Sequence, residues 1–125
     1  MLAWPAVDAA AALAELKELS PQLRAIVLLG RDGRIDAATG SEAGVAAVAA
    51  AAVRLVERAE AVAHDLGHRD LAQLQAATAE GSVFAVLDER RVALATTDAD
   101  PTVGLVFYDL KTLLRTLAAQ EADVA

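Results

Sequence analysis

Apolar side chains recur every three or four residues in the first part of the chain, which is the spacing of a helix that buries one face. This stripe predicts a helix over residues 6–19, with Asp8 as its N-cap. Ser20 precedes Pro21, and the residue before a proline is disfavoured in the helical region. The helix is therefore expected to end there.

Two apolar runs follow, over residues 23–29 and 35–39, and each has the length of a β-strand. Asp32-Gly33 lies between them. An Asp-Gly pair flanked by apolar runs is a strong hairpin signal, because glycine accepts the positive φ of a primed turn. The two strands are predicted to be antiparallel neighbours.

The longest patterned segment begins at Ser41 and halts at Gly67, which predicts a helix of about 25 residues. Its larger apolar residues fall on one side, where a sheet would lie. They are Val48, Val53, Leu55, Val56, Val62 and Leu66. The opposite side of the first half carries only small residues, Ala46, Ala47, Ala50 and Ala51. We favour a second contact with another helix there; alternatively, alanine is simply a good helix former on a solvated face.

Three short strands are predicted next, over residues 71–78, 83–87 and 92–97, with polar turns between them. Together they form an antiparallel meander. One face of the first strand carries Leu71, Gln73 and Gln75.

The last helix is predicted to begin with Asp100 as its N-cap and Pro101 at the first helical position, where the missing N–H is not needed. A loose tail is expected after Ala119. The order is thus helix, two strands, helix, three strands, helix. This pattern predicts one α+β domain over residues 1–125, with its core at about 8–119.

Composition excludes several functions. The chain has 125 residues, a net charge of −7 and no cysteine. Without cysteine there is no disulfide, thiolate zinc site or iron–sulfur cluster. The acidic balance argues against nucleic-acid binding, which rests on clustered Lys and Arg. The apolar runs are shorter than a membrane span, and the N-terminus lacks the pattern of a signal peptide. We expect a cytoplasmic protein without membrane insertion.

Candidate chemistry is sparse. His64-Asp65-Leu66-Gly67-His68 approximates the H-E-x-x-H zinc motif, but Asp is shorter than Glu and Gly67 should end the helix between the two histidines. No third histidine is present, and no phosphate-binding, dinucleotide or nucleophile-elbow motif occurs. We therefore predict no metal, no cofactor and no catalytic residue.

The hairpin at residues 26–38, the long alanine-rich helix, the meander and the stretch 100–110 together resemble the roadblock family, also called the dynein light chain roadblock family. The resemblance covers about residues 8–119. It implies a profilin-like, five-stranded antiparallel sheet, with the first and last helices on one face and the long helix on the other. It also implies a homodimer joined through the third strand and the long helices. Its interface would include Ala46, Ala47, Ala50, Ala51, Leu71, Gln73 and Gln75.

The function implied by this resemblance is a partner surface instead of an active site. Bacterial, MglB-like members bind a Ras-like small GTPase and regulate its nucleotide cycle, which implies a non-catalytic regulator or adaptor. Arg54 and Arg58 are candidates for that contact, or alternatively belong to a solvated helix face. Two other functions stay open: a homodimeric scaffold without a GTPase, and a small-molecule sensor with a polar pocket between sheet and helices.

Overall fold

The computed structural model describes residues 8–124, and its elements follow the predicted order. They are α1 (Ala9–Leu19), β1 (Leu23–Gly30), β2 (Ile35–Ala38), α2 (Glu42–Asp65), β3 (Gln73–Ala77), β4 (Gly81–Leu87), β5 (Arg91–Asp98) and α3 (Val103–Val124). Residues 6 and 7, predicted in the first helix, lie outside the described residues. Asp8 caps α1 as predicted, because its carboxylate accepts a hydrogen bond from the Ala11 N–H at 3.0 Å.

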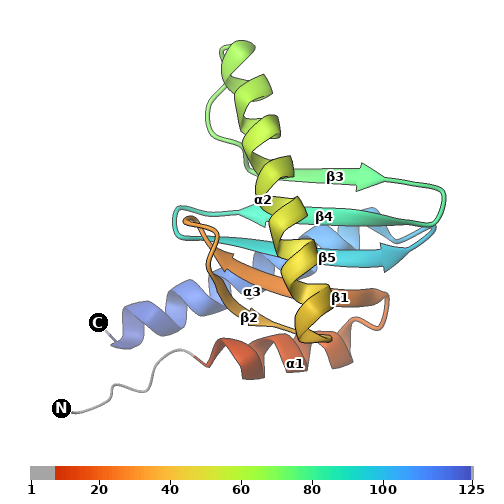
Figure 1. Ribbon diagram of the computed structural model, residues 1–125. Helices are drawn as coiled ribbons and strands as arrows, with labels where there is room; N and C mark the ends of the chain where they lie inside the picture. Colours follow the sequence, from red (N-terminus) through yellow and green to blue (C-terminus); the bar gives the residue numbers. More distant parts are fainter. Residues whose placement is uncertain (1–7, 125) are drawn as a thin grey trace.

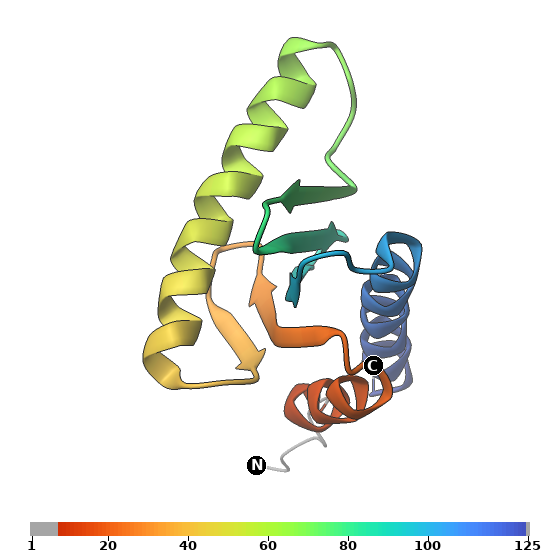
Figure 2. The same ribbon diagram turned by 90° about the vertical axis from the view of Figure 1, so that its right-hand side faces the viewer.

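The five strands form one antiparallel sheet in the order β2-β1-β5-β4-β3. The central pair, β1 and β5, is matched from Leu23↔Thr97 to Gly30↔Arg91. The edge strands are β2 and β3. Helix α2 covers one face of the sheet, while α1 and α3 cover the other (Figures 1 and 2). The α+β class and the placement of helices on both faces are confirmed.

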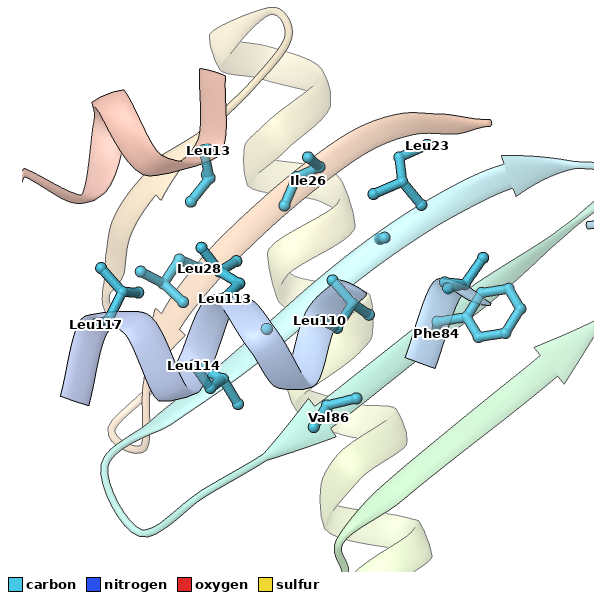
Figure 3. Close-up of a cluster of buried hydrophobic side chains, with 13 residues drawn as sticks. Leu13, Leu23, Ile26, Leu28, Phe84, Val86, Leu110, Leu113, Leu114 and Leu117 are labelled. Atoms are coloured by element: carbon cyan, nitrogen blue, oxygen red, sulfur yellow. The ribbon is translucent and has the colours of Figure 1, made fainter. Parts of the chain in front are cut away.

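Each face of the sheet has its own apolar core. The core under α1 and α3 is built from large side chains, including Leu13, Ile26, Phe84 and Leu110, all of which are fully buried (Figure 3). Phe84 also meets Phe107 edge to face, with ring centroids 5.1 Å apart. In such a core, removing a side chain leaves a cavity and lowers the stability of the fold.

The core under α2 uses smaller residues on the helix side. Ala49, Ala52 and Val56 pack on sheet residues that include Val27 and Leu94. The small side chains of the helix therefore leave most of the apolar bulk of this core to the sheet.

The first hairpin forms as predicted, but its turn is different. Gly33 has φ +90°, whereas Asp32 is not in the positive-φ region that a primed turn needs at both central positions. Instead, the Gly33 N–H donates to the Gly30 carbonyl and the Gly30 N–H donates to the Arg34 carbonyl. This pattern is a three-residue loop with glycine in the bulge position.

Both ends of α3 differ from the prediction. Asp100 has φ +58° and does not cap the helix, and Pro101 lies before it. The chain is held instead at Thr102, whose N–H donates to Gln22 Oε1 at 2.9 Å and whose carbonyl accepts from the Val106 N–H. The expected loose tail is helical to Val124.

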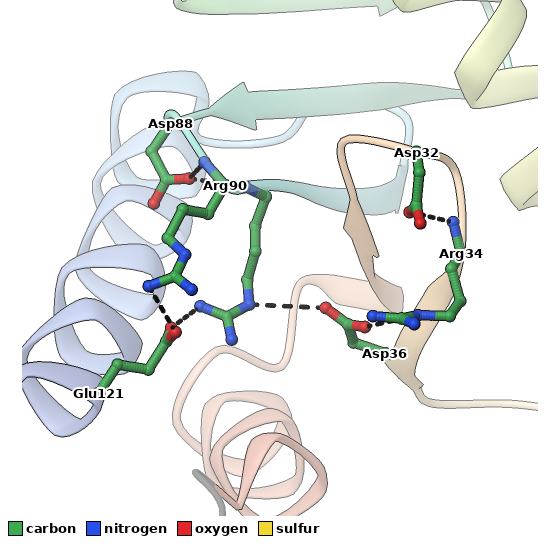
Figure 4. A network of polar contacts seen from close by, with 7 residues as sticks. Asp32, Arg34, Asp36, Asp88, Arg90 and Glu121 are labelled. Atoms are coloured by element: carbon green, nitrogen blue, oxygen red, sulfur yellow. Dashed lines mark hydrogen bonds and ion pairs between the residues drawn. The ribbon is translucent and has the colours of Figure 1, made fainter. Parts of the chain in front are cut away.

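The end of α3 is anchored by ion pairs (Figure 4). Glu121 accepts from Arg91, and it also lies 3.0 Å from Arg90. Arg91 in turn lies 3.5 Å from Asp36 of β2 and has a side chain only 16% exposed. The last turns of α3 are therefore tied to β5 and to the opposite edge strand.

Candidate interaction surface

Helix α2 is longer than the sheet is wide. Its 24 residues extend about 36 Å. Five strands spaced by about 4.8 Å span only about 19 Å. The helix runs across the strands and continues past the edge strand β3 (Figure 1). The last turns of the helix therefore have no sheet of their own to cover.

Large apolar side chains in the last turn and at the C-cap of α2 are left in solvent. Val62 is 58% exposed and Leu66 is 64% exposed. The prediction that these two residues face the sheet is wrong, although Val48, Val53 and Val56 of the same stripe do pack against it. We call Ala51, Leu55, Val62 and Leu66 the overhang flank. At 100° per residue its first three members fall within about 40° of one another.

The other flank of α2 is fixed to its own chain. Glu60 accepts from Arg31 of the β1–β2 turn at 3.0 Å. Glu60 lies roughly 160° around the helix from Val62, counting 100° per residue. The two sides of α2 thus differ: one is tied to the sheet, and the overhang flank is open.

Gly67 ends α2 as predicted. It has φ +74°, and the His68 N–H donates to the Ala63 carbonyl while the Gly67 N–H donates to the His64 carbonyl. This pair of bonds is a Schellman motif. Both histidines are exposed, and within residues 8–124 no three metal-ligating side chains gather.

Strand β3 leaves one hydrogen-bonding edge open, because it pairs only with β4. It begins at Gln73, two residues later than predicted. Gln73 and Gln75 are exposed, and Gln75 Nε2 donates to Ser82 Oγ at 3.3 Å. Leu71 precedes the strand and packs with Leu74 in the core under α2, so it does not share the exposed face of the two glutamines.

The alanines and arginines singled out on α2 all lie outside the core. Ala46, Ala47, Ala50 and Ala51 are exposed. Arg54 and Arg58 are exposed on the side of the helix away from the sheet, and neither forms an ion pair with any residue that the structure describes. Sequence reasoning found this small-residue face but missed the overhang flank. The sequence could have indicated this flank, because the predicted helix is longer than a five-stranded sheet is wide.

The space between α2 and the sheet is small. A cavity of about 70 Å³ lies there, lined by residues that include Leu29, Arg31, Val56 and Glu60. Pockets for small molecules usually measure about 300–1,000 Å³. This site therefore gives no support to a small-molecule sensor. In the described part of the chain, no helix is both long and apolar enough to cross a membrane.

Known proteins resemble this chain in backbone structure and not in sequence. No family model and no curated protein matches the sequence. Among solved structures, MglB from Myxococcus xanthus matches with a TM-score of 0.82 at 16% identity, covering 100% of this chain and 96% of that one. A Roadblock/LC7 domain from Streptomyces avermitilis has a TM-score of 0.82 at 16% identity, with 90% and 97% covered. Profilin II from Acanthamoeba castellanii has a TM-score of 0.53 at 16% identity, with 81% and 89% covered.

These matches show that the chain has the fold of the roadblock domains, within the wider profilin-like architecture. Among those domains, its backbone is similar over its whole length to that of MglB. The resemblance inferred from the hairpin, the long helix, the meander and the final helix is thus confirmed at the level of the fold.

Proposed function

We propose that this protein is a homodimeric, non-catalytic regulator or adaptor of a Ras-like small GTPase. The observation that carries the proposal is the overhang flank of α2 beside the open edge of β3. An unpaired strand edge and an exposed apolar patch are both surfaces that proteins normally cover.

A second copy of the chain fits both surfaces at once. If the two β3 strands pair across a two-fold axis, the sheet of one copy extends beneath the part of the other copy's α2 that runs past its own sheet. The contact is then isologous, because each copy offers the same patch. Ala47 and Ala51 on the exposed side of α2 would let the two long helices approach closely.

The GTPase partner is supported by the backbone similarity to MglB and by the family resemblance of the sequence. The hydrolytic groups would belong to the GTPase. This chain would act by binding one nucleotide state more tightly than the other, since a ligand with equal affinity for both states shifts nothing. Arg54 and Arg58 offer exposed cations on the outer side of α2.

Light scattering tests the dimer. We expect twice the mass of one chain at micromolar concentration. Val62→Glu should yield a monomer, because it would bury a carboxylate in the interface. Ala47→Glu and Ala50→Glu test whether the alanine face is also buried in the dimer, because each should then lower the mass to that of one chain. Ala10→Glu, an exposed alanine on α1, is the matched control and should leave the mass unchanged. A monomer mass for the unaltered protein contradicts the dimer.

Affinity capture from lysate of the source cells, in GTP and in GDP, tests the partner. A Ras-like GTPase retained in one nucleotide state is the expected result. Arg54→Glu with Arg58→Glu should weaken its binding while the dimer persists. Glu15→Lys with Glu18→Lys, across the sheet on α1, should matter less. If no small GTPase is retained in either state, the scaffold function replaces the proposed one.

A further inference from the structure

A second surface lies on the opposite side of the molecule, between α1 and α3. The two helices contact each other, and their outer sides enclose a groove of about 500 Å³. Ala12, Leu16 and Leu113 are the more buried of the apolar residues that line it. Three of the seven large apolar side chains that are exposed in the described residues also line it: Leu19, Leu105 and Tyr108. Most of the exposed large apolar side chains of α1 and α3 are thus gathered in this groove.

The charge of the groove has a single sign. Asp8, Glu15 and Asp109 line it, and none of its lining residues is Lys or Arg. The cations of the same two helices, Lys17, Lys111 and Arg115, lie outside it. A groove with an apolar lining and three carboxylates attracts a ligand that is apolar on one side and positively charged on the other.

The carboxylates are held in place by the fold. Asp109 accepts from the hydroxyl of Ser20, a buried residue directly after α1. Asp8 accepts from the Ala11 N–H as the cap of α1. Glu15 lies between them along the groove and has no ion-pair partner within residues 8–124. Two fixed acids and one free acid therefore line a preformed site.

We propose that this groove binds a basic amphipathic helix of a partner protein. The 11 residues of α1 measure about 16 Å, which matches about three turns of a docked helix. Apolar residues at positions i, i+3, i+4 and i+7 of that helix would contact Leu16, Leu19 and Leu113. Its Lys or Arg residues would reach Asp8, Glu15 and Asp109. Phosphate backbones, anionic membranes and acidic segments are repelled by the same carboxylates.

This inference does not depend on the proposed function. The groove lies across the sheet from α2, so the overhang flank and the outer side of α2 stay free while it is occupied (Figure 2). A chain that binds one partner on each face joins the two partners in one complex.

The test uses a fluorescently labelled 14-residue helical peptide with leucine at i, i+3, i+4 and i+7 and lysine at the remaining positions. A second peptide with the same leucines and glutamate in place of lysine controls for charge. We expect the lysine peptide alone to bind in fluorescence anisotropy. Amide shifts in NMR spectra of the full chain should concentrate on α1 and α3.

Matched variants decide whether binding uses the groove. Glu15→Lys with Asp109→Asn should weaken binding by about tenfold. Glu57→Lys with Glu89→Gln changes the net charge equally at exposed sites away from the groove and should change the affinity by less than about twofold. Leu19→Ser with Leu105→Ser should also weaken binding, whereas Val103→Ser, an exposed apolar residue outside the groove, should not.

Three outcomes overturn the proposal. Equal weakening by both charge variants means that only net charge is sensed. No effect of the leucine changes means that the apolar lining is not used. Tighter peptide binding to a variant lacking residues 2–7 means that this chain's own N-terminal segment, which precedes Asp8, occupies the groove.

Discussion

The two faces of the sheet are covered by unlike layers. On the α1–α3 face, Leu13, Phe84, Leu110 and other large side chains close a core within one chain. On the α2 face, the helix contributes mainly alanine and valine to the core, and it leaves Val62 and Leu66 in solvent. Both layers leave apolar side chains in solvent: on the first they line the groove between α1 and α3, and on the second they lie where α2 runs past the sheet. The large buried side chains are thus concentrated on one face, and the surface proposed for self-association lies on the other.

The largest expected effect comes from the α1–α3 face. Phe84→Ala removes a fully buried ring that packs against Phe107, so it should lower the free energy of unfolding by about 4 kcal/mol. Urea denaturation of this variant and of the unaltered protein measures the difference. Val62→Ala, on the exposed flank, is the control; measured at a protein concentration low enough to give monomers, it should cost less than about 1 kcal/mol. If the two variants lower the free energy of unfolding by similar amounts, the two faces do not differ in their contribution to stability.

The α2 face should make stability depend on protein concentration. In a dimer, the melting temperature rises with concentration because association favours the folded state. Val62→Ser with Leu66→Ser should remove that dependence and lower the melting temperature at high concentration by several degrees, roughly the effect of 1–2 kcal/mol. Calorimetry across a hundredfold range of concentration makes the measurement. A flat response in the unaltered protein would mean that the overhang flank stays in solvent.

The ion pairs at the end of α3 should have a smaller effect. Arg91→Gln leaves Asp36 and Glu121 without their shared cation in a half-buried place, which should cost about 1–2 kcal/mol. Hydrogen exchange should also show faster opening of the last two turns of α3. Arg91→Gln combined with Glu121→Gln gives the coupling energy. If exchange in those turns is unchanged, the ion pairs do not anchor the helix.

The smallest effect is expected at the surface. Arg24 lies 3.1 Å from Asp98, but their side chains are 64% and 73% exposed. Arg24→Gln should therefore change the free energy of unfolding by less than about 0.5 kcal/mol. The same denaturation measurement checks it. If Arg24→Gln lowers the free energy of unfolding as much as Arg91→Gln does, burial does not determine how much the two ion pairs contribute to stability.

The order of the helices and strands could be predicted from the sequence, because local signals specify each element. The apolar periods, the Asp-Gly pair and Gly67 each act within a few residues of themselves. The ends of α3 depended on distant residues instead. Gln22 holds Thr102 from 80 positions away, and Arg91 holds Glu121 from 30 positions away. No local pattern carries such contacts, so Asp100 and Ala119 were wrong predictions for the start and the end of the helix.

The candidate surfaces also differ in whether the sequence alone could predict them. The overhang flank was predictable in principle, because helix length and sheet width both follow from residue counts. Leu71 was misplaced because the strand begins at Gln73, so Leu71 lies before the strand and does not follow its alternation of faces. The acidic groove was beyond sequence reasoning, since it exists only after α1 and α3, at opposite ends of the chain, pack side by side.

The strand order has a consequence for how the chain folds. The inner strand β1 pairs with the central strand β5, which lies more than 60 residues later in the chain. During synthesis, Ile26-Val27-Leu28-Leu29 therefore leaves the ribosome long before the strand that completes its ladder. The local β3-β4-β5 meander closes short loops, whereas joining it to β1 is a slow, long-range step. Until that step, an apolar strand stays unpaired along one edge, and this interval is when the nascent chain is most prone to aggregate.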